Sequence, residues 1–212
     1  MPAEPRRDAR VAGILLAAGT ASRMGSNKLL MRLDGESLLR RAARAALAGG
    51  IEPLLVVVGH EEERARGELA GLDCQPVVNP IYQEGIATSL KAGVRALPAA
   101  AGAAVVMLAD MPLVSGEMIA ALVARWRAGD EPLVISEYDS VEGPVNAPPM
   151  LYDRALFGEL LASDDGRCGR QVVKRHRHEA GVLPWPESAL ADVDVPDDAA
   201  RLDALAPTEG GR

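Results

Sequence analysis

The sequence has few aromatic residues: Phe, Trp and Tyr make up 3% of its 212 residues, although apolar residues as a whole make up 48%. The chain is therefore long and apolar enough for one large domain, but it must build its core from Ala, Val and Leu. Such a core requires close packing, which Gly and Ala permit by letting backbone elements approach one another.

Cysteines and long apolar runs are also scarce. Cys74 and Cys168 lack the C-x-x-C spacing of a zinc site and do not form a disulfide framework, so we expect two free, buried thiols. No apolar run approaches the roughly 18 residues that would suggest a membrane-spanning helix. The polar segment 1–10 lacks the apolar stretch of a secretory signal. These absences predict a cytoplasmic protein that does not bind membranes.

Positive charge is in deficit, with 23 Lys and Arg against 30 Asp and Glu and a formal net charge of −7. Nucleic acid is therefore excluded as the main partner, because such binding depends on basic surface that neutralises phosphates. Any anionic ligand must instead find a local positive pocket.

Apolar segments alternate with helical patterns along the first two thirds of the chain. The pattern predicts strands at 11–17, 53–58, 76–79, 103–109 and 133–136. It predicts helices from the cap Ser37 to 48, at 61–70 and 85–97, and from the cap Ser115 to 128. Most of these strands are apolar throughout, which is typical of a parallel sheet covered on both faces.

The remaining segments give weaker signals. Residues 29–33 and 150–152 are predicted to be short extended pieces, Asp34-Gly35 a turn, and 138–149 the longest irregular loop. Helices are expected at 153–162, 168–176 and 197–205, with a late strand at 178–183. The predicted fold is a single-domain, three-layer, doubly wound α/β structure with a mostly parallel, Rossmann-like sheet. It should span residues 10–206, with flexible ends at 1–9 and 207–212.

The segment Val11–Lys28, VAGILLAAGTASRMGSNK, carries the strongest chemical signal. A buried strand here runs into a loop of small residues that also contains Arg23 and Lys28. Small side chains let backbone N–H groups approach an anion, and the two cations supply counter-charge. This combination predicts a phosphate-binding loop.

Two common phosphate-binding loops do not fit this segment. In a P-loop, Gly19 and Gly25 would be one residue closer and a Lys would directly follow the second glycine. The dinucleotide fingerprint G-x-G-x-x-G is absent as well. The pattern that remains is L-A-A-G-x-x-x-R-M-G-x-x-K, from Leu16 to Lys28.

Further candidate residues follow other predicted strands. Ligands of open parallel sheets bind at the carboxyl ends of the strands, which places 18–28, 59–60, 79–85 and Asp110 around one crevice. Asp110 directly follows a buried strand, and Mg²⁺ typically takes one or two carboxylates together with substrate phosphates. Asp194 is the candidate for the second carboxylate.

Two basic features are less specific. His60 is interpreted as a surface turn residue rather than a ligand group. The basic run 174–178, KRHRH, is interpreted as a solvated helix end, with guidance of an anionic acceptor as the alternative.

Four motifs together resemble the MobA-like nucleotidyltransferases, and most closely their molybdenum cofactor cytidylyltransferase branch. They are the loop Leu16–Lys28, G-x-x-x-S at Gly85 and Ser89, LADMP ending the fourth strand, and VDVPD around Asp194. The LAAG form at 16–19 is similar to the cytidylyl branch. The resemblance implies a nucleotidyltransferase fold and transfer of CMP from CTP to molybdopterin, with release of pyrophosphate and with Mg²⁺ as cofactor. It also implies a possible molybdenum hydroxylase partner.

The resemblance also implies roles for individual residues. Arg23, Lys28 and Asp110 would be catalytic, and Asp110 and Asp194 would hold Mg²⁺. The implied nucleotide-binding residues are Leu16, Ala17, Ala18, Gly19, Thr20, Arg23, Met24, Lys28, Asn79, Gly85, Ser89 and Asp110.

The chain departs from the family pattern at two places. Val195 replaces the Thr of D-T-P, and Ala147-Pro148-Pro149 stands where G-x-P is usual, in a segment expected to face the acceptor. The acceptor is therefore less well defined than the nucleotide. A cytidylyltransferase for a sugar or alditol phosphate, or a non-catalytic accessory protein that binds the cofactor for a hydroxylase, remain alternatives.

Overall fold

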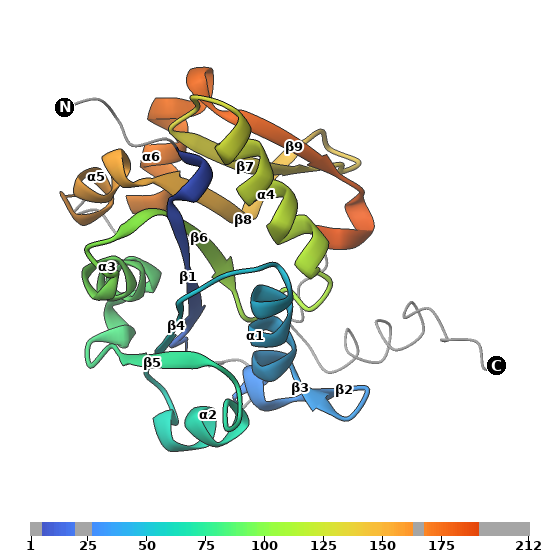
Figure 1. Cartoon of the computed structure of the whole chain (residues 1–212). Coiled ribbons are helices and arrows are strands. Elements are labelled where there is room, and N and C mark those ends of the chain that lie inside the picture. The colour runs from blue at the N-terminus through green and yellow to red at the C-terminus, as the bar shows by residue number, and fades with distance from the viewer. Residues whose placement is uncertain (1–5, 20–26, 163–167, 191–212) are drawn as a thin grey trace.

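The computed structural model describes residues 6–19, 27–162 and 168–190. A seven-stranded sheet with the order β5-β4-β1-β6-β8-β7-β9 runs through the centre of the molecule (Figure 1). Its strands are β1 (Arg10–Ala17), β4 (Leu54–Val58), β5 (Cys74–Val78), β6 (Ala101–Leu108), β7 (Leu133–Tyr138), β8 (Val145–Asp153) and β9 (Gly181–Trp185).

The sheet is mostly parallel, as predicted. β1 pairs in parallel with β4 and β6, β4 with β5, and β7 with β9. The connecting helices are α1 (Leu38–Ala48), α2 (Glu62–Glu68), α3 (Ile86–Ala96), α4 (Gly116–Ala128), α5 (Phe157–Ala162) and α6 (Cys168–His176). The predicted caps are confirmed, because Ser37 accepts a hydrogen bond from the Arg40 N–H and Ser115 accepts one from the Met118 N–H.

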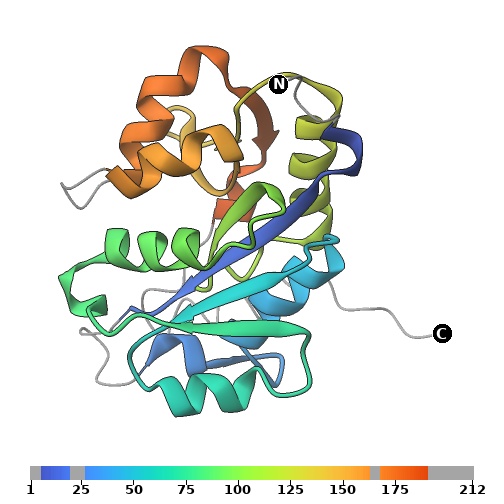
Figure 2. The same cartoon turned by 60° about the vertical axis from the view of Figure 1, so that its left-hand side comes forward.

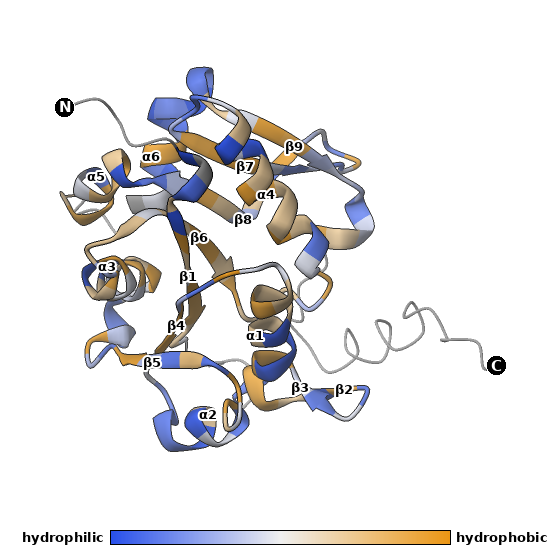
Figure 3. Cartoon of the chain, in the orientation of Figure 1, coloured by the Kyte–Doolittle hydropathy of each residue, from blue (hydrophilic) through white to orange (hydrophobic). Residues whose placement is uncertain are grey.

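Helices cover both faces of the sheet, which gives three layers. One apolar cluster joins alternate residues of β1, such as Val11 and Leu15, to α1, α2 and α4. The second cluster joins the intervening residues, such as Ile14 and Leu16, to α3, α5 and α6. Figure 2 shows the two groups of helices on opposite sides of the sheet, and Figure 3 shows apolar strands between helices with polar outer surfaces.

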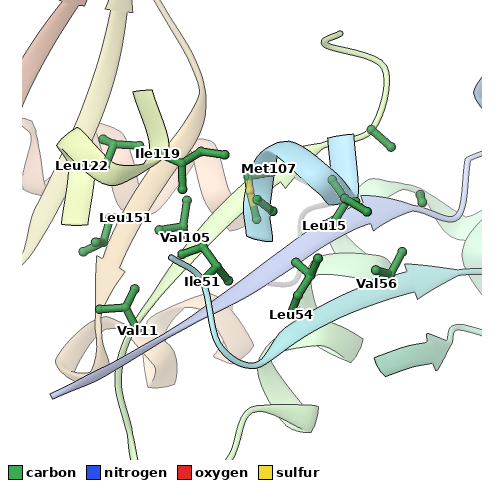
Figure 4. Packing of buried hydrophobic residues seen from close by; sticks show 14 of the residues in the cluster. Val11, Leu15, Ile51, Leu54, Val56, Val105, Met107, Ile119, Leu122 and Leu151 are labelled. Atoms are coloured by element: carbon green, nitrogen blue, oxygen red, sulfur yellow. The ribbon is translucent and has the colours of Figure 1, made fainter. Parts of the chain in front are cut away.

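The core consists of closely packed aliphatic side chains, as the shortage of aromatic residues predicted. Leu15, Leu54 and Val105 are fully buried, and they pack with Ile119 and Leu122 of α4 (Figure 4). On the other face, a Cβ atom added at Gly93 would lie 2.4 Å from Cγ2 of Ile14, so only glycine lets α3 approach β1 this closely.

The strand β8 corrects the prediction of an irregular loop at 138–149. Residues Val145–Asp153 form one strand that lies antiparallel to both β6 and β7, and only 139–144 connect it to β7. Proline-containing segments are usually not central strands because proline lacks the N–H donor. Pro148 and Pro149 are tolerated because the β7–β8 register shifts at this point, and their carbonyls accept hydrogen bonds from Tyr138 and Ser136 instead.

Smaller differences concern element ends. Within the predicted extended piece 29–33, Lys28–Leu30 form a 3₁₀ turn (η2), and only Arg32–Leu33 (β2) is extended, paired with Glu36–Ser37 (β3). The late strand begins at Gly181 rather than residue 178, because Arg177–Glu179 (η5) form a 3₁₀ turn. The remaining 3₁₀ turns are η1 (Arg6–Asp8), η3 (Tyr82–Glu84), η4 (Arg154–Leu156) and η6 (Glu187–Leu190). The predicted helix 197–205 lies outside the described residues.

The N-terminal end of the described chain contacts α4. Arg6 forms an ion pair of 3.0 Å with Asp153, and its guanidinium lies over the ring of Trp126. Arg6 falls inside the segment predicted as a flexible tip, and the predicted domain boundaries stay a prediction.

The cysteines and the helices can be compared with the expectations of free thiols and of no membrane-spanning segment. Cys74 is free and only half-buried, and partial burial, with Asp73 nearby, raises the pKa of its thiol. The side chain of Cys168 is not described. Among the described residues, no helix has the length and apolar character needed to cross a membrane.

Candidate active site

The carboxyl ends of β1, β4, β5 and β6 lie side by side, and short backbone hydrogen bonds continue the ladder beyond the strands. The Ala109 N–H donates to Leu16 O at 3.2 Å, and the Asn79 N–H donates to Val58 O at 2.8 Å. The strand order reverses at β1, because β4 and β5 lie on one side of it and β6 on the other. A reversal of this kind opens a crevice at the strand ends, which is the usual ligand site in open α/β sheets.

Lys28 and Asp110 meet in this crevice. Asp110 follows β6 and Lys28 begins η2 after the loop of β1, yet Nζ and Oδ2 lie 2.7 Å apart. The two side chains are 21% and 25% exposed, so both remain accessible to a ligand. The structure therefore joins the two residues that the sequence selected from separate motifs.

A cavity of about 300 Å³, here called the strand-end cavity, surrounds this ion pair. Seven of the predicted nucleotide-binding residues line it: Leu16, Ala18, Gly19, Lys28, Gly85, Ser89 and Asp110. Ala17 does not, because its side chain is buried in the core under α1. Thr20, Arg23, Met24 and Asp194 lie outside the described residues.

Asn79 supports the cavity from behind rather than lining it. Its side chain is 2% exposed, and its amide donates to the hydroxyls of Thr88 at 2.8 Å and Ser89 at 3.0 Å. Its carbonyl oxygen accepts from the Ile81 N–H. The Thr88 hydroxyl is hydrogen-bonded to the loop before α3. Ser89, in contrast, also lines the strand-end cavity.

Replacing Asn79 with Ala should lower the free energy of unfolding by about 1–3 kcal/mol, because buried partners lose their hydrogen bonds. Nucleotide affinity should fall as well, since Asn79 holds Ser89 in place. Urea unfolding and a nucleotide titration measure the two effects. Gln75→Ala, which removes a side-chain amide at an exposed position of β5 outside both cavities, is the control and should alter stability little. Equal stability of the two variants would contradict the supporting role of Asn79.

Several residues that line the strand-end cavity belong to no sequence motif and were not predicted. Tyr82 and Gln83 of η3 and Ile86 of α3 line the strand-end cavity, within the segment 79–89 but without a motif of their own. Gly85, with φ of 116°, makes the turn between η3 and α3 that few other residues could adopt. His60 lies behind Tyr82, with ring centroids 6.2 Å apart, and does not line the strand-end cavity.

The crevice offers limited protein ligation to a divalent metal. Among the described residues there is no group of three or more His, Cys, Asp or Glu side chains that could hold an ion. Asp110 supplies one carboxylate at the crevice, which fits Mg²⁺, because that ion is commonly bound by one or two carboxylates, substrate phosphates and waters. The sharing of the metal with Asp194 stays a prediction.

A second, larger cavity of about 980 Å³ adjoins the first, and Leu16, Ile86 and Leu108 line both. Its floor and sides are largely apolar, with Leu90 of α3, Val106 of β6 and Met150 of β8 among them. Asn146, Ala147 and Pro148 also line it, so the segment that departs from the family pattern is part of its wall. We call it the large cavity.

Lys174, Arg175 and His178 of the basic run are exposed, as the preferred sequence interpretation predicts, but some cations at this end of α6 also border the large cavity. Arg170, Lys174 and Arg177 line the large cavity. Arg175 and His176 point instead to α5, where both pair with Glu159. The helix thus presents one basic side to the cavity and one to the carboxylates that anchor it.

His176 contacts two carboxylates through both nitrogens of its ring, so the strength of these contacts depends on whether the ring is charged. Its ring nitrogens lie 2.7 Å from Glu179 and 3.0 Å from Glu159. The hydrogen bond to Glu179 has the largest effect on the pKa of His176 and raises it, partial burial opposes this, and Glu159 raises the pKa further. The net result is a pKa above the ordinary value of 6.5.

Because the pKa of His176 is higher in the folded than in the unfolded protein, the charged ring stabilises the fold. This stabilisation is fully present below the pKa that His176 has in the unfolded protein. It is lost as the pH rises through the pKa that His176 has in the folded protein. His176→Gln should therefore be less stable than wild type at about pH 6, and the difference should shrink towards about pH 9. Urea unfolding over this range measures it. His178→Gln is the control, because that ring is 79% exposed and 3.9 Å from Glu179. A difference for His176→Gln that does not vary with pH would contradict the prediction.

The chain is similar in sequence and in fold to known proteins. The bifunctional protein GlmU of Anaeromyxobacter sp. is 36% identical over 83% of this chain, which spans only 35% of GlmU. Nicotine blue oxidoreductase of Paenarthrobacter nicotinovorans is 28% identical, with 91% of this chain and 96% of that protein covered. The crystal structure of Rv0371c from Mycobacterium tuberculosis has a TM-score of 0.78 at 25% identity, covering 92% of this chain and 98% of that one.

A family model, described as the MobA-like NTP transferase domain, matches residues 13–180. This range includes the loop after β1, Asp110 and both cavities up to Arg177. The chain belongs to the MobA-like NTP transferase family.

Proposed function

We propose that the protein transfers CMP from CTP to the terminal phosphate of molybdopterin and releases pyrophosphate. The observation that carries the proposal is the Lys28–Asp110 pair in a small cavity that opens into a large, mostly apolar one. The first is lined by Ala18, Gly19 and Lys28, which flank the proposed phosphate-binding loop. The second has room for the ring system of a pterin.

The reaction requires little acid–base chemistry from the protein. An ionised phosphate oxygen of the acceptor attacks the α-phosphorus of CTP, the new P–O bond forms, and the bond to the β-phosphate oxygen breaks. Positioning and charge stabilisation then account for most of the catalysis. Lys28 would turn from Asp110 to the phosphates within the strand-end cavity.

A divalent metal would be held by Asp110 and the phosphates, and Asp194 is the proposed second carboxylate. When bound, it neutralises charge on the triphosphate. Rv0371c, a fold neighbour at 22% identity, has been solved in complex with manganese, which motivates the proposal of a divalent cation here. Mg²⁺ is the proposed ion here.

The composition of the large cavity favours a pterin over a sugar phosphate. A sugar or alditol offers many hydroxyls, each of which costs free energy if it is buried without a partner. Among the described lining residues, Asn146 and Tyr152 are the uncharged side chains with polar groups, and the rest of the wall is aliphatic or cationic. The apolar faces of a fused ring suit these surroundings better.

Pyrophosphate release tests the proposal directly. CTP with molybdopterin and Mg²⁺ should give turnover, whereas CTP with a panel of sugar and alditol phosphates should give little. CTP should bind about tenfold or more tightly than GTP, because a base pocket discriminates through a few hydrogen bonds whose loss costs about 1–3 kcal/mol each. Preference for GTP, or turnover with the sugar phosphates alone, would overturn the assignment.

The oxidoreductase named among the relatives calls for one further control. The chain is incubated with a reduced nicotinamide cofactor and a planar aromatic dye, in the absence of CTP. Reduction of the dye without pyrophosphate release in the CTP assay would place this protein with the Paenarthrobacter relative and not with the nucleotidyltransferases. We expect no reduction.

A further inference from the structure

We propose that the acceptor carries a second anionic group, distant from its reacting phosphate, and that Arg170, Lys174 and Arg177 bind it. These three residues are called the basic wall. The inference rests on the proposed function, because it describes the molecule that receives the nucleotide. It adds a charge requirement that neither the family motifs nor the nucleotide chemistry implies.

The positions of the three cations are the first observation. They are spaced by four and three residues, so they lie on one side of α6 and of the turn η5 that continues it. All three line the large cavity, together with Gly169 and Val173 of the same side. Seven helical residues rise by about 10 Å, so the basic wall extends along a substantial part of the cavity.

Charge balance is the second observation. No Asp or Glu is among the described residues that line the large cavity, although the chain as a whole has a net charge of −7. Within the described part of the chain, Arg175 and His176 are paired with Glu159, whereas no described carboxylate forms an ion pair with Arg170 or Lys174. Positive charge without a described acidic partner therefore lies on the wall of this cavity, where an acceptor would lie.

Arg177, one of the three residues of the basic wall, is held in place by an ion pair. Its guanidinium forms an ion pair of 2.7 Å with Glu137 of β7, and Glu137 also accepts from the Asn146 amide at 3.3 Å. Both Arg177 and Asn146 line the large cavity. Glu137 therefore orients two polar groups towards the same space, while α6 is fixed to α5 through Glu159.

The relative position of the two cavities indicates how the acceptor would be oriented. They meet at Leu16, Ile86 and Leu108, next to the Lys28–Asp110 pair, so the reacting phosphate belongs at this junction. The apolar residues of α3, β6 and β8 lie against the body of the molecule. The basic wall lines the large cavity but not the strand-end cavity, so it would receive a group other than the reacting phosphate, an anion such as a dithiolate, a carboxylate or a second phosphate.

A pair of fluorescent probes tests the basic wall without any assumption about the nucleotide. Anilinonaphthalene sulfonate has an apolar ring system and one anionic group, and N-phenyl-1-naphthylamine has the same ring system without the charge. Arg170→Gln with Lys174→Gln should weaken binding of the sulfonate by about tenfold, as expected for the loss of charge-assisted hydrogen bonds, and leave the neutral probe within about twofold.

The matched control is Arg10→Gln with Arg95→Gln. It removes the same charge from two exposed positions, and neither residue lines the large cavity. This variant should bind both probes like wild type. Equal weakening of sulfonate binding in the two double variants, or no weakening in either, would overturn the proposal.

Steady-state kinetics provide the second measurement. In Arg170→Gln with Lys174→Gln, the KM for molybdopterin should rise about tenfold or more, while the KM for CTP stays within about twofold. Absence of turnover with molybdopterin in wild type would refute the proposed function, and the probe measurement would still decide whether the basic wall binds an apolar anion. A raised KM for CTP with an unchanged KM for the acceptor would assign the basic wall to the nucleotide and overturn the inference.

Discussion

Replacing Lys28 with Ala is expected to lower turnover by about 100-fold or more. Lys28 lines the strand-end cavity, 2.7 Å from Asp110, where a triphosphate would place its charge. Loss of one preorganised group that stabilises a transition state typically costs about 2.7–4 kcal/mol. Single-turnover kinetics with saturating CTP would measure this loss without interference from product release.

The stability of Lys28→Ala should differ little from that of wild type. Partly exposed ion pairs contribute about 0–1 kcal/mol, and Lys28 is 21% exposed. Arg32→Ala is a suitable control, because it removes a comparable ion pair, that with Glu68, outside both cavities. If Lys28→Ala unfolds at much lower temperature but turns over normally when folded, Lys28 has a structural role.

Replacing Asp110 with Asn is expected to abolish metal-dependent turnover. The amide has nearly the same shape as the carboxylate, so packing at the end of β6 is preserved. It carries no charge, however, and is a poor ligand for Mg²⁺, which prefers carboxylate and phosphate oxygens. Turnover measured over a Mg²⁺ titration should stay near background at every concentration.

The apo protein should tolerate Asp110→Asn with a small loss of stability, because the Lys28 ammonium then loses its counter-charge. Asp34→Asn is the matched control, since Asp34 forms a surface ion pair of 3.2 Å with Arg41 away from the crevice. Wild-type turnover of Asp110→Asn at saturating Mg²⁺ would show that the carboxylate does not serve a metal. The same measurement on Asp194→Asn would decide whether the second predicted carboxylate shares the ion.

The core of the fold was predictable from the sequence because its signals are local. The apolar run of β1 and the cap Ser37 each depend on neighbouring residues, and α1 lies where the cap predicted it. The meeting of Lys28 with Asp110 was predictable for a different reason. In a mostly parallel sheet, residues that follow different strands reach the same edge, so sequence order alone brings the two motifs together.

The segment 145–149 shows where local signals fail. Two consecutive prolines argue against a strand, yet Val145–Asp153 is a strand between β6 and β7. The register shift beside the prolines and the hydrogen bonds from Ser136 and Tyr138 make it possible. These partners become neighbours only when the chain has folded, so tertiary contacts override the local preference.

The sequence by itself determined part of the strand-end cavity, because Gly19, Lys28 and Asp110 each belong to a short motif that follows a strand. Tyr82, Gln83 and Ile86 join its wall only in the folded chain. Only the tertiary structure decided the large cavity, because α3, β6, β8 and α6 come from separate parts of the chain and no single segment signals the space between them. The basic run at the end of α6 predicts a solvated helix end from its own composition. The packing of α6 against α5 through Glu159 directs Arg175 and His176 away from the cavity and leaves Arg170, Lys174 and Arg177 on its wall.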